Sequence, residues 1–195
     1  MKKTFWIIIA LLLVLGGCSF SSYNGLVEAE EQVNQQWSQV EVQYQRRADL
    51  IGNLVETVKA NAEFEEGTLS GIAEARAQVG LMKVTKEVLD DPQAFERFTQ
   101  AQSQLGGALS RLLSVSEKYP ELRANEAFQG LMVQLEGTEN RIARSRQQFN
   151  EVAQAYNTKV RKFPAALFAN LFGFDTKQYF QASEGSQAAP EVNFD

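Results

Sequence analysis

The sequence VNQQWSQVEVQYQRRADLIGNLVETV, residues 33–58, decides the fold of this chain. Alternating steps of four and three residues along it lead through a series of side chains that are all apolar or aromatic, except for one arginine. The members of the series are Val33, Trp37, Val40, Tyr44, Arg47, Ile51, Leu54 and Val58. A repeat of about 3.5 residues held this long predicts a long helix packed in a left-handed antiparallel bundle or coiled coil.

Two later segments carry the same repeat. The second series is apolar or aromatic throughout and consists of Phe98, Ala101, Leu105, Ala108, Leu112, Val115 and Tyr119. The third series has three polar members and consists of Phe128, Leu131, Leu135, Thr138, Ile142, Ser145, Phe149, Val152, Tyr156, Lys159 and Phe163. Each long segment therefore has one face suited to burial against its neighbours.

The prolines divide the chain into helices, which we expect over residues 26–62, 65–84, 92–117 and 122–163. Asp91 suits the N-cap of the third helix and Pro92 its first turn. We find no alternating β-branched run of strand length. The prediction is an all-α, elongated antiparallel bundle of three long legs and about four helices, because the middle leg is broken. A short aromatic-rich C-terminal tail follows it.

The tail has aromatic residues spaced too irregularly for an amphipathic helix. Residues 163–168 suit a short helix, and Phe172, Phe174, Tyr179 and Phe180 follow. We interpret these residues as a clamp that folds back onto the bundle, because aromatic side chains bury large apolar areas. The alternative is a segment that dips into a membrane. Residues 183–190 are small and polar, which favours a flexible end.

The amino terminus has the form of a bacterial lipoprotein signal. Lys2 and Lys3 precede an apolar run over residues 5–15, and the run ends at Leu15-Gly16-Gly17-Cys18. The run is short for a transmembrane helix, and small residues precede the cysteine. This tetrad resembles a lipobox, with Cys18 as the acceptor of lipid. The alternative is an uncleaved signal anchor with an incidental cysteine, which would hold the protein in the inner membrane.

This interpretation divides the chain into four segments. Residues 1–17 are the signal peptide, 18–25 the lipid anchor and a short linker, 26–182 the helical bundle with its clamp, and 183–195 a flexible tail. Ser19 stands where an aspartate would favour retention in the inner membrane, so the outer membrane is favoured.

The composition excludes several classes of enzyme. The chain has no histidine and one cysteine, so it lacks the residues of serine triads, cysteine–histidine dyads and histidine-ligated zinc sites. The formal charge of -5 is unfavourable for binding nucleic acid. We predict no cofactor, no metal and no catalytic residue.

One group of polar residues is a candidate polar layer or partner site: Arg46, Arg47, Asp49, Glu136, Glu139 and Asn140. Arg47 lies in the apolar series and must be paired if it is buried, and Glu136 or Glu139 are its best candidate partners. We favour a polar layer that sets the register of the bundle. The alternative is a pocket for an anion or a peptide carboxylate, which the planar guanidinium suits.

Two charged patches flank this group. Glu28, Glu30 and Glu31 are acidic but form no calcium loop, so we interpret them as a solvated face. The basic patch consists of Arg141, Arg144, Arg146, Lys159, Arg161 and Lys162. We favour its pairing with the acidic first helix over an interaction with anionic lipid or a partner.

Four stretches, in order along the chain, resemble the LemA family over nearly all of the mature length. They are residues 23–27, residues 46–59, residues 135–143 continuing through Arg146, Asn150, Tyr156 and Asn157 to 163–164, and residues 172–174 with 179–180 and 190–194. The resemblance implies a membrane-attached protein with an antiparallel helical domain and without established catalytic activity. Gly52 and Phe64 depart from it, since the family usually has proline and histidine there.

Together these patterns predict a non-catalytic, membrane-anchored lipoprotein that serves as a scaffold or interaction protein of the bacterial cell envelope. Its expected partners are membrane lipid through Cys18, with palmitate among the attached chains, and an envelope protein of unknown identity. The first alternative is an enzyme or enzyme subunit of cell-envelope metabolism that uses carboxylates and arginines. The second is a membrane-remodelling protein.

Overall fold

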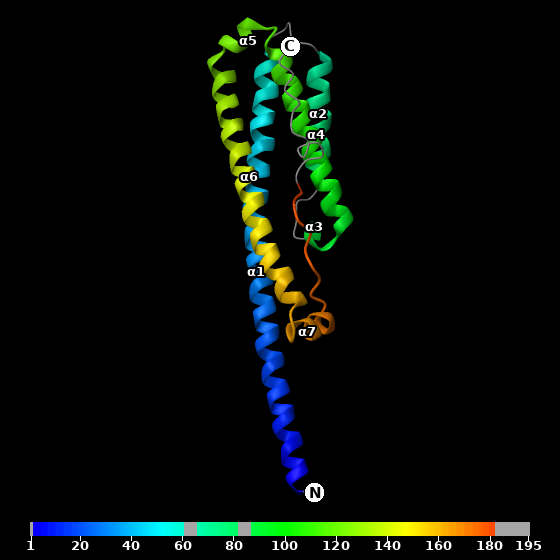
Figure 1. Ribbon diagram of the computed structural model, residues 1–195. Coiled ribbons are helices and arrows are strands. Elements are labelled where there is room, and N and C mark those ends of the chain that lie inside the picture. The colour runs from blue at the N-terminus through cyan, green and yellow to red at the C-terminus, as the bar shows by residue number, and fades with distance from the viewer. Residues whose placement is uncertain (1, 61–65, 82–86, 182–195) are drawn as a thin grey trace, which may run out of the picture.

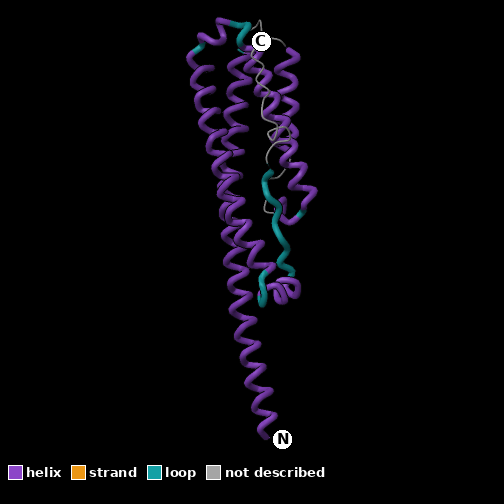
Figure 2. The backbone as a smooth tube through the Cα atoms, viewed as in Figure 1, coloured by secondary structure: helices purple, strands orange, loops and turns teal. Residues whose placement is uncertain are grey.

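The computed structural model describes residues 2–60, 66–81 and 87–181. Over these residues the fold is all-α, as the sequence predicted (Figure 2). The helices are α1 (Lys2–Lys59), α2 (Glu66–Leu81), α3 (Glu87–Asp90), α4 (Pro92–Ser116), α5 (Pro120–Ala124), α6 (Glu126–Arg161) and α7 (Ala165–Phe172). The short helices α3 and α5 are additional to the four long helices of the prediction.

The long helices are arranged as two pairs (Figure 1). Helix α1 packs along α6, and α2 packs along α4. The middle leg of the prediction therefore consists of two helices that lie side by side. Helix α5 lies at one end of the bundle and α7 near the other, and α1 continues beyond α7 toward the amino terminus (Figure 1).

The apolar series of α1 forms the centre of the bundle. All eight of its members are buried, including Arg47, and six of them are less than 2% exposed. In the series of α6, every member from Phe128 to Tyr156 is buried or partly buried, but the last two members, Lys159 and Phe163, are exposed. Ala153 and Val160 are buried instead. A straight α-helix drifts by about 20° per heptad from a strict seven-residue repeat, which explains this error.

The helix starts follow local capping chemistry. Asp91 is the N-cap of α4, as predicted, and its side chain accepts a hydrogen bond of 2.8 Å from the Gln93 amide. Asn125 caps α6 in the same way, and it accepts from the Phe128 amide at 3.1 Å. The predicted helix over 122–163 is therefore interrupted at Asn125, because this cap has an extended backbone.

Helix α1 is continuous across residues 18–25, the predicted anchor and linker. The backbone of Cys18 is helical, while its side chain lies outside the described residues, as do residues 183–195 and Phe64. Among the described helices, we find none with the length and apolar character needed to cross a membrane. The four segment boundaries stay predictions. At Gly52, α1 comes close to α2, since a Cβ there would lie 2.9 Å from Nη2 of Arg76.

The tail folds back onto the bundle through Phe174 and Phe180, as the predicted clamp requires. Both rings are buried, whereas the rings of Phe172 and Tyr179 are about half exposed. The Phe180 ring stacks on Trp37 of α1 at 6.0 Å, and it also contacts Phe95 of α4 and Phe149 of α6. One tail residue thus joins the α1–α6 pair to the α2–α4 pair.

Two asparagines on α6 hold the backbone of the tail. The Asn150 side chain donates to the Phe180 carbonyl at 2.8 Å and accepts from its amide at 2.9 Å. The Asn157 side chain does the same for Lys177, at 2.9 and 2.8 Å. A carboxamide offers a donor and an acceptor side by side, so it pairs with an extended residue much as a neighbouring strand would. Asn150 and Asn157, which the resemblance to the LemA family singled out, therefore serve the fold.

We expect Phe180→Ala to lower the free energy of unfolding by about 3 to 5 kcal/mol, because it removes the ring that joins the two helix pairs. Phe163→Ala is the matched control: this ring is 81% exposed, so its loss should change stability by less than about 0.5 kcal/mol. Urea unfolding followed by circular dichroism measures both. Equal effects for the two variants would contradict this role of Phe180.

Candidate functional site

The candidate site is a groove that lies over Arg47, between α1, α4 and α6. Its volume is about 1190 Å³. Polar residues from all three helices and the tail line it, among them Tyr44, Arg47, Gln102, Glu139, Arg146 and Tyr179. The α4 and α6 backbones make no extensive contact with each other in the described residues, so the groove opens between the side chains of these two helices.

Arg47 lies at the base of the groove and is 4% exposed. Its Nη1 donates to Glu139 Oε1 at 3.2 Å, so Glu139 is the partner of Arg47 among the two candidates, Glu136 and Glu139, that the sequence offered. Its Nη2 donates to the Gln102 carbonyl at 3.3 Å and also to the Gln102 side-chain oxygen. The guanidinium also lies 5.1 Å from the centre of the Tyr44 ring. Arg47 thus connects all three helices.

The layer around Arg47 is not fully satisfied. Arg47 Nε and Gln102 Nε2 are buried without a hydrogen-bond partner among the described residues. Burial raises the pKa of the nearby Tyr44 hydroxyl above its ordinary value, although the charges of Arg146 and Arg47 oppose the change. Tyr44 therefore stays neutral at physiological pH. The layer presents a buried cation, amide donors and a neutral phenol toward the groove.

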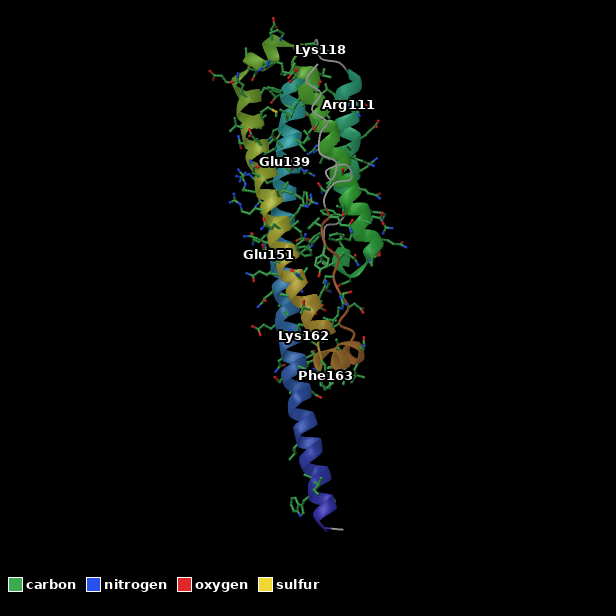
Figure 3. The ribbon with its side chains drawn as sticks, in the orientation of Figure 1. Arg111, Lys118, Glu139, Glu151, Lys162 and Phe163 are labelled. Carbon is green, nitrogen blue, oxygen red and sulfur yellow. The ribbon has the colours of Figure 1, made fainter. Side chains whose placement is uncertain are left out.

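The other predicted members of the site lie apart from this layer. Arg46, Asp49, Glu136 and Asn140 are exposed. Asp49 accepts a hydrogen bond from Gln45 on its own helix at 2.9 Å. Glu136 lines the groove without a described bond to Arg47. Of the six predicted residues, the structure joins Arg47 and Glu139 directly, on helices that Figure 3 shows side by side.

Gln102 is a residue of the layer that sequence reasoning missed. It follows Ala101 in the second apolar series, at a position that a helical wheel leaves near the edge of the buried face. Its side chain is 5% exposed. A polar residue beside a seam position is the signal that could have pointed to it.

Lys177 forms a second buried charge network, also missed from sequence. It is 6% exposed, and its Nζ lies 2.5 Å from Asp90 and 3.1 Å from Glu30. Burial alone would lower the pKa of Lys177, but the hydrogen bonds to Asp90 and Glu30 outweigh it and raise the pKa above its ordinary value. The interpretation of Glu30 as part of a solvated face was wrong, because Glu30 pairs with a tail residue far away in sequence.

The predicted pairing of the basic patch with the acidic first helix was also wrong. Over the described residues, no ion pair joins a member of the basic patch to an acidic residue of α1, and Glu30 pairs with Lys177 instead. Lys159 donates instead to the Gly25 carbonyl at 2.9 Å. Arg146 donates to the Gln181 carbonyl at 3.0 Å and stacks over the Phe180 ring. The basic residues at the carboxyl end of α6, Arg161 and Lys162, are exposed.

The groove can bind and orient a polar partner, but no recognisable reaction centre is assembled in the described part of the chain. Glu139 is engaged by Arg47, and no group of three or more His, Cys, Asp or Glu residues in that part is placed to hold a metal ion. The groove therefore has the chemistry of a structural layer or a contact surface: two guanidinium groups, three carboxylates, neutral amides and phenols, and apolar walls.

Comparison with known proteins assigns the class to which this elongated helical bundle belongs. The model of the LemA family matches residues 36–194. This range includes the apolar series of α1 from Trp37 onward, all of α4 and α6, and the tail with its Asn150 and Asn157 contacts. The chain belongs to the LemA family.

Three relatives illustrate the range of the family. Magnetosome protein MamQ of Magnetospirillum gryphiswaldense is 31% identical over 174 residues, covering 81% of this chain and 64% of that protein. Magnetosome protein MamQ 2 of Paramagnetospirillum magneticum is 30% identical over 175 residues, covering 82% and 64%. Protein LemA of Metamycoplasma hominis is 22% identical over 185 residues, covering 93% and 80%. The chain thus spans 64% of the length of each magnetosome relative.

If the Arg47 layer sets the register, Arg47→Met should lower the free energy of unfolding by about 1 to 3 kcal/mol, because the Gln102 carboxamide loses its partner. The double variant Arg47→Met/Gln102→Leu should recover most of this loss, since an apolar pair replaces the polar one. Glu139→Gln is the control, and it should cost less than about 1 kcal/mol because its side chain is 47% exposed. Unchanged stability in Arg47→Met would favour a binding role.

Tyr156→Phe should make the protein less sensitive to alkaline pH. The Tyr156 hydroxyl is buried without a partner in the described residues, and burial, with the charges of Glu30, Asp175 and Asp90, raises its pKa far above 10.0. The unfolded chain ionises near pH 10.0 while the folded chain keeps the proton, so stability falls as pH rises above that value. The variant should match or exceed wild-type stability at neutral pH and lose less of it above pH 10.0, measured by urea unfolding. Identical pH profiles would contradict this.

Proposed function

We propose that this LemA-family chain is a non-catalytic lipoprotein of the bacterial cell envelope, anchored through Cys18, in which the helical bundle serves as a scaffold or interaction module. The observation that carries the proposal is the form of α1. Its amino-terminal part extends past the rest of the bundle, uncovered by any other described element, and it exposes large apolar side chains (Figure 1). These side chains are Phe5, Trp6, Ile7, Leu13 and Phe20, each more than 60% exposed.

Such an apolar rod is unfavourable in water. Each buried Å² of apolar surface contributes about 25 cal/mol, so the exposed residues of this segment favour transfer into lipid or removal by a signal peptidase. The eleven apolar residues 5–15 rise about 16 Å, roughly half of the hydrocarbon core of a bilayer. This length suits the hydrophobic region of a signal peptide, and it supports acylation at Cys18 as the lasting attachment.

The bundle itself supports the scaffold role. From Cys18, where the proposed mature chain begins, to Lys59, helix α1 has 42 residues and is about 63 Å long, and α6 runs along much of it. Buried aromatic contacts and the Asn150 and Asn157 hydrogen bonds hold the carboxyl-terminal tail against α1 and α6. A rod of this kind can hold a surface away from the membrane. The groove over Arg47 is the surface that we propose as a partner site, if the Arg47 layer proves to have a role beyond stability.

The proposal of a non-catalytic role depends on residue chemistry. Histidine is absent, and the buried Arg47–Glu139 and Lys177–Asp90 pairs neutralise charges that a reaction would need free. The names of the relatives refer to magnetosomes and to LemA, and no reaction is part of them. We carry over from them the expectation of an assembly-associated protein.

Metabolic labelling with palmitate tests the proposed lipid attachment at Cys18. Expressed in a bacterium fed radiolabelled palmitate, the wild-type chain should incorporate label and fractionate with membranes, and it should separate into the outer-membrane fraction. Cys18→Ala should incorporate none, because the acceptor thiol is missing. Cys18→Ser is a second control that keeps the size and polarity of the side chain. Equal labelling in wild type and Cys18→Ala would overturn the lipoprotein proposal.

The scaffold role is tested in the same cells by crosslinking and capture from detergent-solubilised envelopes. A specific envelope protein should copurify with wild type and be reduced in Cys18→Ala, which leaves the membrane surface. Recovery of no specific protein would contradict the scaffold role, while palmitate labelling would still report on the anchor.

A further inference from the structure

A second exposed apolar surface lies at the end of the bundle from which α1 projects. Helix α7 exposes Leu167 (63%) and Leu171 (73%), and Phe163, two residues before the helix, is 81% exposed. These residues follow one another at intervals of four, so Leu167 and Leu171 share one face of α7. The opposite face carries Ala169, which is 1% exposed and packs on the bundle. We name Phe163, Leu167 and Leu171 the α7 face.

The α7 face differs from the aromatic clamp that the sequence predicted. Phe174 and Phe180 of that clamp are buried in the core, so they are not available to lipid. The exposed apolar residues stand earlier, on a helix without a single charged side chain. Gly173 ends this helix in the left-handed conformation, at φ 75°, and its turn directs the following residues back to the bundle.

The position of α7 relative to the anchor indicates what covers this face. The Tyr23 ring of α1 contacts Phe172 at 5.1 Å and Phe174 at 5.7 Å, so α7 is fastened at the level of Tyr23. Tyr23 follows Cys18 by five residues, a rise of about 8 Å along α1. The polar interface of a bilayer is about 5 to 8 Å thick on each side. An anchor at Cys18 therefore holds α7 at the lipid surface.

Charge supports the same occupant. Arg161 and Lys162 lie exposed at the end of α6, immediately before Phe163, and Figure 3 shows Lys162 and Phe163 together beside α7. From Lys159 to Phe174 the chain contains no acidic residue. Apolar side chains bordered by exposed bases are typical of surfaces that lie in the headgroup region of anionic membranes.

We propose that the α7 face is a membrane-contact site, in which Phe163, Leu167 and Leu171 enter the headgroup region of an anionic bilayer while Arg161 and Lys162 pair with lipid phosphates. This inference rests on the proposed membrane anchor. It adds a second point of attachment beside the acylated end of α1. Two points of contact restrict the tilt of the rod, whereas a single lipid anchor on a helix end leaves it free to pivot.

Spin labelling of the full-length acylated chain tests the inference in vesicles of phosphatidylcholine with phosphatidylglycerol. A label at Leu171→Cys should be reached more readily by oxygen, which concentrates in lipid, than by a water-soluble nickel chelate. Val133→Cys is the matched control, because Val133 is 69% exposed and lies on α6 about 40 Å from Val160. Its label should show the opposite preference. The chain without an added cysteine reports any labelling of unacylated Cys18.

The outcomes separate the α7 face from the anchor. If the vesicles float with the protein and the Leu171 label is as open to the nickel chelate as the Val133 label, the α7 face is in water and the inference is overturned. If the Leu171 label is shielded from both reagents, a protein surface covers α7 and the inference is also overturned. Failure of the wild-type chain to float with vesicles would instead refute the anchor.

The contribution of charge has its own measurement. Arg161→Gln/Lys162→Gln should reduce the lipid preference of the Leu171 label in anionic vesicles, and wild type in pure phosphatidylcholine should show a similar reduction. Both bases are exposed, so circular dichroism should confirm an unchanged fold. A Leu171 label that responds to neither change would overturn the role of Arg161 and Lys162.

Discussion

The structure depends on a short extended tail that is bound by two asparagine side chains of α6. Asn157 and Asn150 each pair with both backbone groups of one tail residue, and they are seven residues apart on one helix face. Their spacing fixes the tail parallel to the helix axis and delivers the Phe180 ring to Trp37, Phe95 and Phe149. Without this ring, the α1–α6 pair and the α2–α4 pair would face each other across an incompletely filled core.

Two buried cations complete the connection between the pairs. Arg47 joins α1 to Gln102 on α4 and Glu139 on α6, and Lys177 joins the tail to Glu30 on α1 and Asp90 at the end of α3. A buried ion pair adds little net stability, but a mispaired one is costly. We therefore expect these two networks to disfavour alternative registers of the bundle, in which an apolar series is shifted by one heptad.

Much of this architecture was predictable, and the errors share one cause. The apolar series identified the buried face of α1 correctly at every position, and the local capping rule identified Asp91. Arg47 was expected to pair with Glu136 or Glu139 because it interrupts the apolar series, and the structure selects Glu139. Lys177 and Gln102 were missed because their partners are distant in sequence and no periodic pattern marks them. The predicted burial of Phe163 was wrong because a straight α-helix drifts from a strict heptad repeat over a segment as long as α6.

The sequence by itself determined the long helices, the buried face of α1 and the family. These properties depend on residue order over a few turns, where periodicity and composition carry the information. Only the tertiary structure decided which tail aromatics face inward and which apolar residues stay outside on α7. That choice depends on where α6 ends, where Gly173 turns the chain, and which gap between helix pairs is left for a ring to fill. Such a gap exists only after residues far apart in sequence have been packed together.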